Sequence, residues 1–228
     1  MVRLDASSLI FLRKEVMKDN KLLFYSRCLL FLFASLGTGI QIYKNGIGML
    51  MYYTTLSNLL VSLFTLYMLM AMLKNIDLQS RNFLRIKAAV TMSIMITFVI
   101  YHFMLAPLAT HFWRVENILC HYITPLYFFF DTLFVDRRRQ YHFLDPVRWT
   151  ALPLLYMVFA LFNGLVLKWP IPDAKDSPFA YYFLNVYKYG WSYVATHAVL
   201  IFLVYILAGY ILYLLKSLQL KPIKTEQS

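Results

Sequence analysis

The stretch that decides the fold is residues 191–215, WSYVATHAVLIFLVYILAGYILYLL. It contains no Lys, Arg, Asp or Glu. A helix needs about 20 mostly apolar residues to cross the hydrocarbon core of a bilayer. The apolar residues here run continuously, whereas a strand of a membrane barrel would alternate apolar and polar residues. The stretch therefore predicts a transmembrane helix.

Five similar stretches precede it. Hydrophobic residues make up 61% of the 228-residue chain and charged residues 14%, against about 25% charged in a typical soluble domain. A soluble domain of this length has too little interior to bury so much apolar surface. We therefore expect an all-α integral membrane bundle, which excludes a soluble enzyme, a disordered chain and a disulfide-stapled secreted domain. The six predicted spans are residues 23–43, 47–73, 88–107, 116–135, 149–167 and 191–215.

Charge fixes the expected orientation of this bundle. The chain has 22 Lys and Arg residues and a formal net charge of +11. Seventeen of the 22 lie in or beside the N-terminal segment, the second and fourth connections and the C-terminal segment. By the positive-inside rule, both termini are predicted to be cytoplasmic. Because the basic residues alternate with the spans rather than gathering on one face, we expect no nucleic-acid partner.

The chain is expected to have three parts. Residues 1–21 mix apolar and charged side chains and predict a cytoplasmic amphipathic helix at the membrane interface, with a disordered tail as the alternative. Residues 22–216 form the transmembrane domain and residues 217–228 a cytoplasmic tail. The first span is expected to stay as an uncleaved anchor, because no small-residue cleavage site follows it.

Polar residues within the spans gather in the outer half of the predicted bundle. At about 1.5 Å of rise per residue, Thr54 to Asn58 would lie about 10–16 Å below the outer end of a span that starts at residue 47. Burying such groups in lipid is costly, so a layer of them predicts a cavity that admits water or a lipid head group. This polar belt comprises Thr54, Thr55, Ser57, Asn58, His102, His121, Thr124, Asn163 and His197.

Two kinds of chemistry fit this polar belt. A hydroxyl nucleophile needs a base within hydrogen-bond reach, and Thr55 and His121 lie on different spans at overlapping depth. Asn58, one turn below Thr55, would orient the histidine or stabilise an oxyanion. The rival is a catalytic zinc held by His102, His121 and His197.

Some of these polar residues have a purely structural interpretation. Asn163 alone is typical of a hydrogen bond between packed helices. In the inner half, Asp131 is expected to be held by the nearby Arg137, Arg138 and Arg139.

Two short motifs resemble those of a known family. They are Tyr53-Thr54-Thr55-Leu56-Ser57-Asn58-Leu59 in the second span, and His121-Tyr122-Ile123-Thr124-Pro125-Leu126 with Asp131-Thr132-Leu133-Phe134 in the fourth. With the number and order of spans, they resemble the androgen-induced-protein family and its bacterial six-span branch. The animal members hydrolyse fatty acid esters of hydroxy fatty acids with a threonine and a histidine.

The resemblance implies that Thr55 is the nucleophile and His121 its partner, with Thr54, directly before it, as the alternative. It implies no metal and no cofactor, and it implies a bacterial plasma membrane as the location. The animal pattern has an Asp where this chain has Asn58, and its interval from histidine to proline is one residue longer.

Two functions follow from these observations. The first is an intramembrane hydrolase of lipid acyl esters, with Thr55 and His121 as catalytic residues and Asn58, His102 and His197 as supporting groups. The second is a non-catalytic protein whose polar belt binds or helps to transport a lipid or small solute. The inner half lacks a continuous polar path, which disfavours a channel. The oligomeric state is left open.

The orientation can be tested with reporter fusions. Fusions after residues 110 and 175 should report outside, and fusions after residues 80, 140 and 228 should report inside, because the basic connections stay in the cytoplasm. A reversed pattern would overturn the orientation and every argument from depth.

Overall fold

The computed structural model describes residues 6–109, 112–174 and 177–218, with side chains from residue 20 onward. Within these ranges every regular element is helical and no β-strand is present. Six helical segments are long and apolar enough to cross a membrane: Asn20–Asn45, Tyr53–Leu73, Arg81–Leu108, Val115–Val135, Asp145–Leu167 and Val186–Ser217. The chain is therefore an all-α, multi-pass membrane protein, which confirms the predicted fold class.

The α-helices do not each coincide with one span. They are α1 (Ala6–Asn45), α2 (Tyr53–Leu73), α3 (Arg81–Ile100), α4 (Val115–Ile118), α5 (Thr124–Val135), α6 (Asp145–Arg148), α7 (Ala151–Phe162) and α8 (Val186–Ser217). Three spans contain a π-helical turn, at Tyr101–Leu105 after α3, at Leu119–Ile123 between α4 and α5, and at Asn163–Leu167 after α7.

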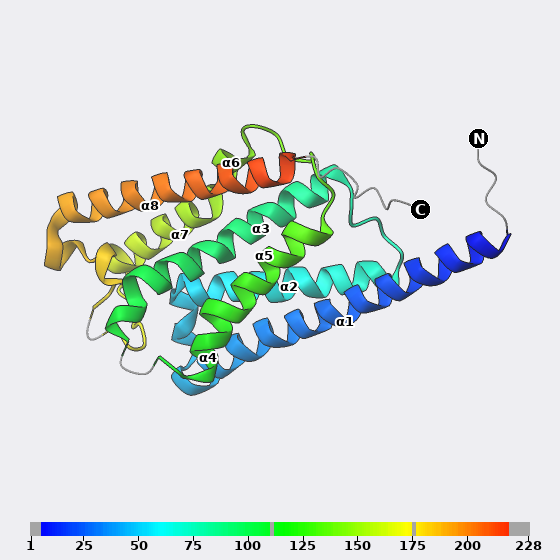
Figure 1. Ribbon diagram of the computed structural model, residues 1–228. Coiled ribbons are helices and arrows are strands. Elements are labelled where there is room, and N and C mark those ends of the chain that lie inside the picture. The colour runs from blue at the N-terminus through cyan, green and yellow to red at the C-terminus, as the bar shows by residue number, and fades with distance from the viewer. Residues whose placement is uncertain (1–5, 110–111, 175–176, 219–228) are drawn as a thin grey trace.

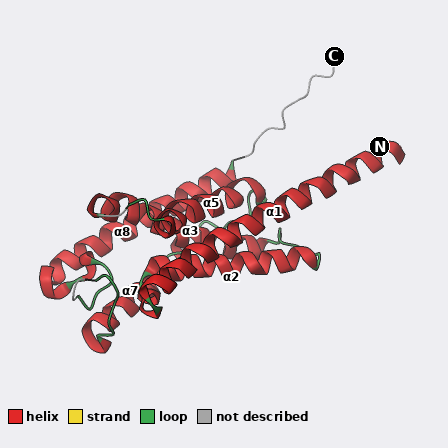
Figure 2. Ribbon diagram, turned by 90° about the horizontal axis from the view of Figure 1, so that it is seen from below, coloured by secondary structure: helices red, strands yellow, loops and turns green. Residues whose placement is uncertain are grey.

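The spans pack as a bundle whose two sides differ. α1 lies along α2, α5 lies on α3, and α8 packs mainly on α6. In Figure 1, α1 and α2 form one side of the bundle, α7 and α8 the other, and α3 and α5 lie between them. Figure 2 shows α1 and α2 side by side from below. The start of α1 and the end of α8 lie at the same end, as an even number of spans requires.

The N-terminal segment continues the first span. α1 is one helix from Ala6 to Asn45, so residues 6–21 do not form a separate element. Their position at the membrane interface stays a prediction. Residues 1–5 and most of the predicted tail, residues 219–228, lie outside the described residues.

The second span begins later than predicted. Gly46 has φ 84°, a 3₁₀-helix covers Ile47–Met51, and Tyr52 is extended, so α2 starts at Tyr53. Only glycine adopts such a positive φ readily, and Gly46 therefore ends α1. Thr54 and Thr55 consequently lie in the first turn of α2, not 10–16 Å below its outer end. In the sixth span, Gly190 (φ 79°) interrupts α8, so the regular helix starts at residue 191, as predicted.

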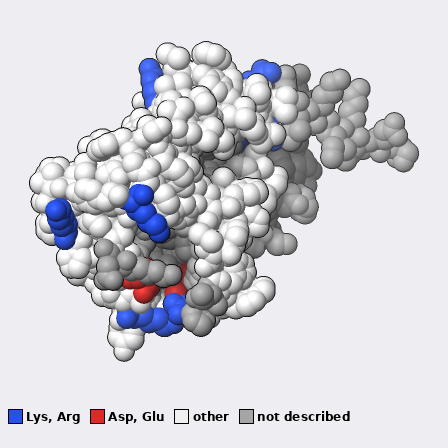
Figure 3. Space-filling view, turned by 90° about the vertical axis from the view of Figure 1, so that its left-hand side faces the viewer, with Lys and Arg blue, Asp and Glu red and all other residues white. Residues whose placement is uncertain are grey.

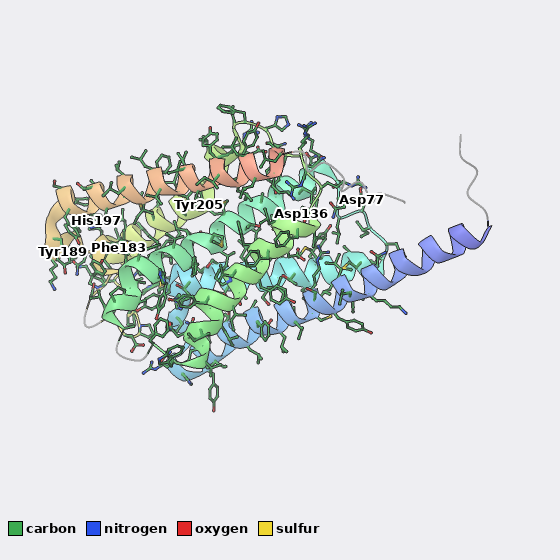
Figure 4. All side chains as sticks on the ribbon, viewed as in Figure 1. Asp77, Asp136, Phe183, Tyr189, His197 and Tyr205 are labelled. Atoms are coloured by element: carbon green, nitrogen blue, oxygen red, sulfur yellow. The ribbon has the colours of Figure 1, made fainter. Side chains whose placement is uncertain are left out.

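A buried ion cluster joins three spans in the half of the bundle that contains the start of α1. Arg27 donates to both carboxylate oxygens of Asp131, at 3.3 Å each. Lys87 Nζ lies 2.6 Å from Asp131 Oδ2 and also contacts Asp136. All of these side chains are at most 6% exposed. Figure 4 labels Asp136 on this side of the bundle.

This cluster corrects the predicted partners of Asp131. Its partners are Arg27 and Lys87, which lie on other spans, rather than the arginines at 137–139. Arg138 instead donates to the carbonyl of Leu215 at 2.7 Å, at the end of α8. The reason is depth, because a carboxylate buried among helices needs a cation that is equally buried.

The cluster predicts a large loss of stability when Asp131 is neutralised. Asp131→Asn leaves the Arg27 guanidinium without its carboxylate in a buried site, a change that typically costs about 3–5 kcal/mol. Thermal unfolding in detergent should show a clear drop in midpoint. Asp77→Asn, on an exposed connection, is the matched control and should change stability by less than about 0.5 kcal/mol. Equal midpoints for both variants would contradict a stabilising role for the cluster.

Candidate functional site

Three of the predicted site residues lie in π-helical turns. His102 is in Tyr101–Leu105, His121 in Leu119–Ile123 and Asn163 in Asn163–Leu167. A π-turn widens the helix by one residue, which changes the direction of the side chains around it, and such turns are frequent at functional sites. These turns decide which of the predicted residues meet.

His121 is held between two partners. Its Nδ1 lies 3.0 Å from the Asn117 carbonyl oxygen, and its Nε2 lies 3.3 Å from Thr54 Oγ1. Because a carbonyl oxygen can only accept, the hydrogen-bond network assigns the proton to Nδ1. Nε2 of the neutral ring is then an acceptor, and the Thr54 hydroxyl donates to it. Tyr101 stacks on the imidazole with ring centroids 3.8 Å apart.

The threonine at His121 is therefore Thr54 and not the predicted Thr55. Thr55 Oγ1 donates to Gln41 Oε1 on α1 at 3.2 Å. Its side chain is completely buried, whereas Thr54 keeps a small exposed area. The two residues are neighbours in the first turn of α2 and point about 100° apart, so both cannot face the same ring. The π-turn and the late start of α2 place Thr54 opposite the imidazole.

Asn58 ties α2 to the fourth span instead of contacting His121. Its Nδ2 donates to the carbonyls of Thr54, at 2.8 Å, and of Cys120, at 3.0 Å. Pro125 has no N–H to offer the preceding turn, which frees a carbonyl of that turn for another donor. Asn58 thus bridges the backbones of Thr54 and of Cys120, the residue before His121, and it positions the Thr54–His121 pair rather than acting on a reacting group.

A glycine lets the first span approach this turn. A Cβ at Gly37 would lie 2.7 Å from Cys120 Sγ and 3.0 Å from Leu119 Cβ. These distances are shorter than van der Waals contact, so a larger residue would push α1 away. Because Gln41 lies one turn further along α1, the same close approach brings it to Thr55.

Tyr181 adds a hydroxyl from the connection between α7 and α8. Its Oη accepts from the Thr54 backbone N–H at 3.3 Å and lies 3.5 Å from Thr54 Oγ1. Burial raises the pKa of the Tyr181 phenol, so it keeps its proton at neutral pH. A protonated phenol beside a hydroxyl nucleophile is a suitable donor to an oxyanion.

Asn163 holds the connection that carries Tyr181. Its Nδ2 donates to the Pro178 carbonyl at 3.2 Å, and its Oδ1 accepts from the Trp169 N–H at 3.2 Å. Next to it, a Cβ at Gly164 would lie 2.1 Å from the Phe179 ring, so only glycine leaves room for that ring. The expected bond between packed helices is thus a bond from a span to the connection between α7 and α8.

His102 and His197 do not join the pair. His102 is exposed, and its Nδ1 lies 3.2 Å from Tyr122 Oη. His197 Nδ1 lies 2.9 Å from the Tyr193 carbonyl, and the residue lines a separate apolar groove along α3 and α8. Among the described residues, no group of three or more His, Cys, Asp or Glu could hold a metal ion. The alternative three-histidine zinc site therefore does not form there.

The Thr54–His121 pair lines a cavity of about 460 Å³. This volume lies in the usual range of small-molecule sites, about 300–1,000 Å³. The walls come from α1, α2, the π-turn at His121 and the connection before α8. Seen from this end of the bundle, most of the surface is uncharged, and acidic side chains gather in its lower part beside basic ones (Figure 3). Besides tyrosines, the polar residues of the lining are Gln41, Thr54, Thr55, His121, Asp173, Ser177, Asn185 and Lys188.

Sequence reasoning missed four residues of this site. Gln41 is an amide inside the first predicted span, and the cost of burying it is a signal that could have found it. Asn117 holds His121 through its backbone carbonyl, and every residue type has such a carbonyl, so the sequence could not predict this contact. Tyr101 and Tyr181 had no distinguishing signal, because tyrosine is common at membrane interfaces.

Comparison of the chain with models of known protein families, with curated proteins and with solved structures gives no match.

The role of Asn163 can be tested by proteolysis. Asn163→Leu removes the part-buried bonds to Trp169 and Pro178, each worth about 0.5–1.5 kcal/mol. Chymotrypsin should therefore cut the connection between α7 and α8 faster. Thr196→Val is the control, because the Thr196 hydroxyl bonds back to its own helix, at the Ser192 carbonyl. Unchanged cleavage of Asn163→Leu would show that other contacts hold the connection.

Proposed function

We propose that the protein is an intramembrane hydrolase of lipid acyl esters, in which Thr54 is the nucleophile and His121 the general base. The observation that carries the proposal is the hydrogen bond from Thr54 Oγ1 to His121 Nε2, with Nδ1 held by the Asn117 carbonyl. A hydroxyl bonded to a histidine whose other nitrogen is fixed is the arrangement that activates serine and threonine nucleophiles.

The residues account for both halves of the reaction. Thr54 Oγ1 attacks the ester carbonyl carbon while its proton passes to His121 Nε2. The oxyanion accepts a hydrogen bond from Tyr181. When the bond from carbon to the alcohol oxygen breaks, His121 gives its proton to the departing alkoxide. Water, deprotonated by His121, then attacks the acyl-threonine and releases the carboxylic acid and the free Thr54 hydroxyl.

The resemblance to the androgen-induced-protein family supports the same reaction class but favours the other threonine. Thr55 donates to Gln41 and is fully buried, so in this geometry it has no base. We therefore assign the nucleophile to Thr54 and to Thr55 only the hydrogen bond that joins α2 to α1. The proposal includes an acyl ester as substrate, no nucleic-acid partner, no cofactor or metal, cytoplasmic termini and a bacterial plasma membrane.

A second candidate function is non-catalytic binding or transport of a lipid or small solute. The size of the cavity favours it independently of the threonine and the histidine, because about 460 Å³ can hold a ligand whether or not it reacts. Flux in reconstituted vesicles without hydrolysis would support this function, and hydrolysis without flux would support the first.

A fluorophosphonate probe tests the nucleophile. It labels activated hydroxyls, so the purified wild-type protein should be labelled and Thr54→Ala should not. His121→Ala should slow labelling about 10²–10⁴-fold, the usual contribution of a general base. Thr55→Ala is the matched control, because it removes the neighbouring hydroxyl from the same helical turn while Thr54 and His121 remain.

The variants separate three results. If Thr55→Ala is no longer labelled and Thr54→Ala still is, the nucleophile is Thr55, as the resemblance implies. Labelling that persists in both folded variants would overturn the hydrolase proposal. Thr54→Ser should keep the labelling, since serine retains the attacking oxygen.

A further inference from the structure

A second cavity shares a wall with the first one at Thr54. Thr54, Tyr101, Leu105 and Tyr181 line both cavities. From this junction the second cavity continues between α3, α7 and α8. The Thr54 hydroxyl thus lies at the boundary of two spaces, whereas Thr55 lines the first alone.

The two cavities differ in chemistry. Most of the second is lined by aliphatic and aromatic side chains, among them Ile96, Ile100, Met157, Ile201 and Phe202. It ends near Tyr205, whose hydroxyl donates to the Trp149 carbonyl at 2.9 Å. In Figure 4, Tyr205 lies between the outer group of Phe183, Tyr189 and His197 and the inner Asp136. The apolar cavity therefore runs from the site toward the middle of the bundle.

One side of this apolar cavity faces lipid. α8 is held at its inner end by α6, where Gly209 packs on Pro146, and at its outer end by the turn Tyr182–Leu184. Between these points α7 and α8 contact each other little. Lining residues on the facing sides of the two helices, Met157 and Ala198, are half-buried rather than buried. In a membrane, the space between α7 and α8 is therefore reached from the hydrocarbon core.

We propose that the acyl chain of the substrate enters from the lipid between α7 and α8, with the ester carbonyl at Thr54 and the first carbons of the chain in the apolar cavity. The alcohol part then lies in the outer cavity beside Ser177 and Asn185. This inference rests on the proposed hydrolase function and adds the route and the two halves of the substrate to it.

The dimensions define the substrate further. The apolar cavity has a volume of about 100 Å³. A dry protein cavity of about 150 Å³ accommodates a single benzene ring. The apolar cavity therefore holds only the first few carbons of an acyl chain beside the ester carbonyl, and the rest of a longer chain extends between α7 and α8 into the lipid. A sterol or a pair of chains beside the carbonyl does not fit. The substrate class is thus an ester of one linear fatty acid with a polar alcohol.

Blocking the apolar cavity tests the route. Ala198→Trp would fill the space between α7 and α8, and the control Val199→Trp places the same ring on the exposed neighbouring position. We compare hydrolysis of the hexadecanoyl and acetyl esters of 4-methylumbelliferone in vesicles. Ala198→Trp should lower the rate with the hexadecanoyl ester at least about tenfold, the scale expected when an oversized side chain competes for a packed space. The acetyl ester, which reaches Thr54 through the outer cavity, should be hydrolysed at the wild-type rate by both variants.

Two failures are distinguishable. If wild-type protein hydrolyses neither ester, the proposed function is overturned and the route with it. If wild-type protein hydrolyses both and Ala198→Trp changes neither, lateral entry is overturned while the hydrolase proposal stands.

A second variant keeps the test informative if Ala198→Trp does not fold. Phe202→Ala widens the cavity, so it should raise the rate with the cyclohexanecarboxylate ester, whose ring lies next to the carbonyl, relative to the hexadecanoyl ester. An unchanged ratio would contradict the assignment of the acyl chain to this cavity.

Discussion

The arrangement of the bundle depends on compensating the buried negative charge of the Asp131 carboxylate. Lipid offers no hydrogen-bond partner, so a charge inside the bundle must be compensated by groups on neighbouring helices. Arg27 on α1 and Lys87 on α3 supply that compensation to Asp131 on α5. Each cation can reach it at one relative height of its helix, so the cluster sets the vertical register of three spans. Lys216 fixes the height of α8 in the same way, because its Nζ donates to the Thr132 and Asp136 carbonyls at the end of α5.

With the half of the bundle that contains the start of α1 fixed in this way, the opposite half has room for irregular backbone. Three spans end in or contain π-turns there, and each turn frees or redirects a polar group. Non-helical backbone at membrane depth is tolerated where protein or a water-filled cavity satisfies it. Asn58 does this for Cys120, and the Asn117 carbonyl accepts from His121. The π-turns, which would be unfavourable in contact with lipid, thus orient the polar side chains of the site.

Hydropathy predicted the six spans because the cost of burying charge acts over whole stretches of about 20 residues. Partner choice depends on single residues and was predicted less well. Asp131 was assigned to arginines near it in sequence, whereas Arg27, about 100 positions earlier, lies beside it in space. Likewise, depth brought His121 to the level of the two threonines, but a straight-helix argument cannot choose between them. The π-turn at Leu119–Ile123 and the start of α2 at Tyr53 rotate and shift both partners, and neither has a local sequence signal.

The position of the Thr54–His121 pair at the junction of a polar and an apolar cavity explains why one chain would combine these features. An acyl ester is amphipathic, and its carbonyl is the boundary between its two parts. A nucleophile deep in either cavity would require the polar end to enter an apolar space or the chain to enter water, and both transfers are unfavourable. At the junction neither transfer occurs. Thr54 has this position and Thr55 does not, so the cavities and the hydrogen bond to His121 both support Thr54 as the proposed nucleophile.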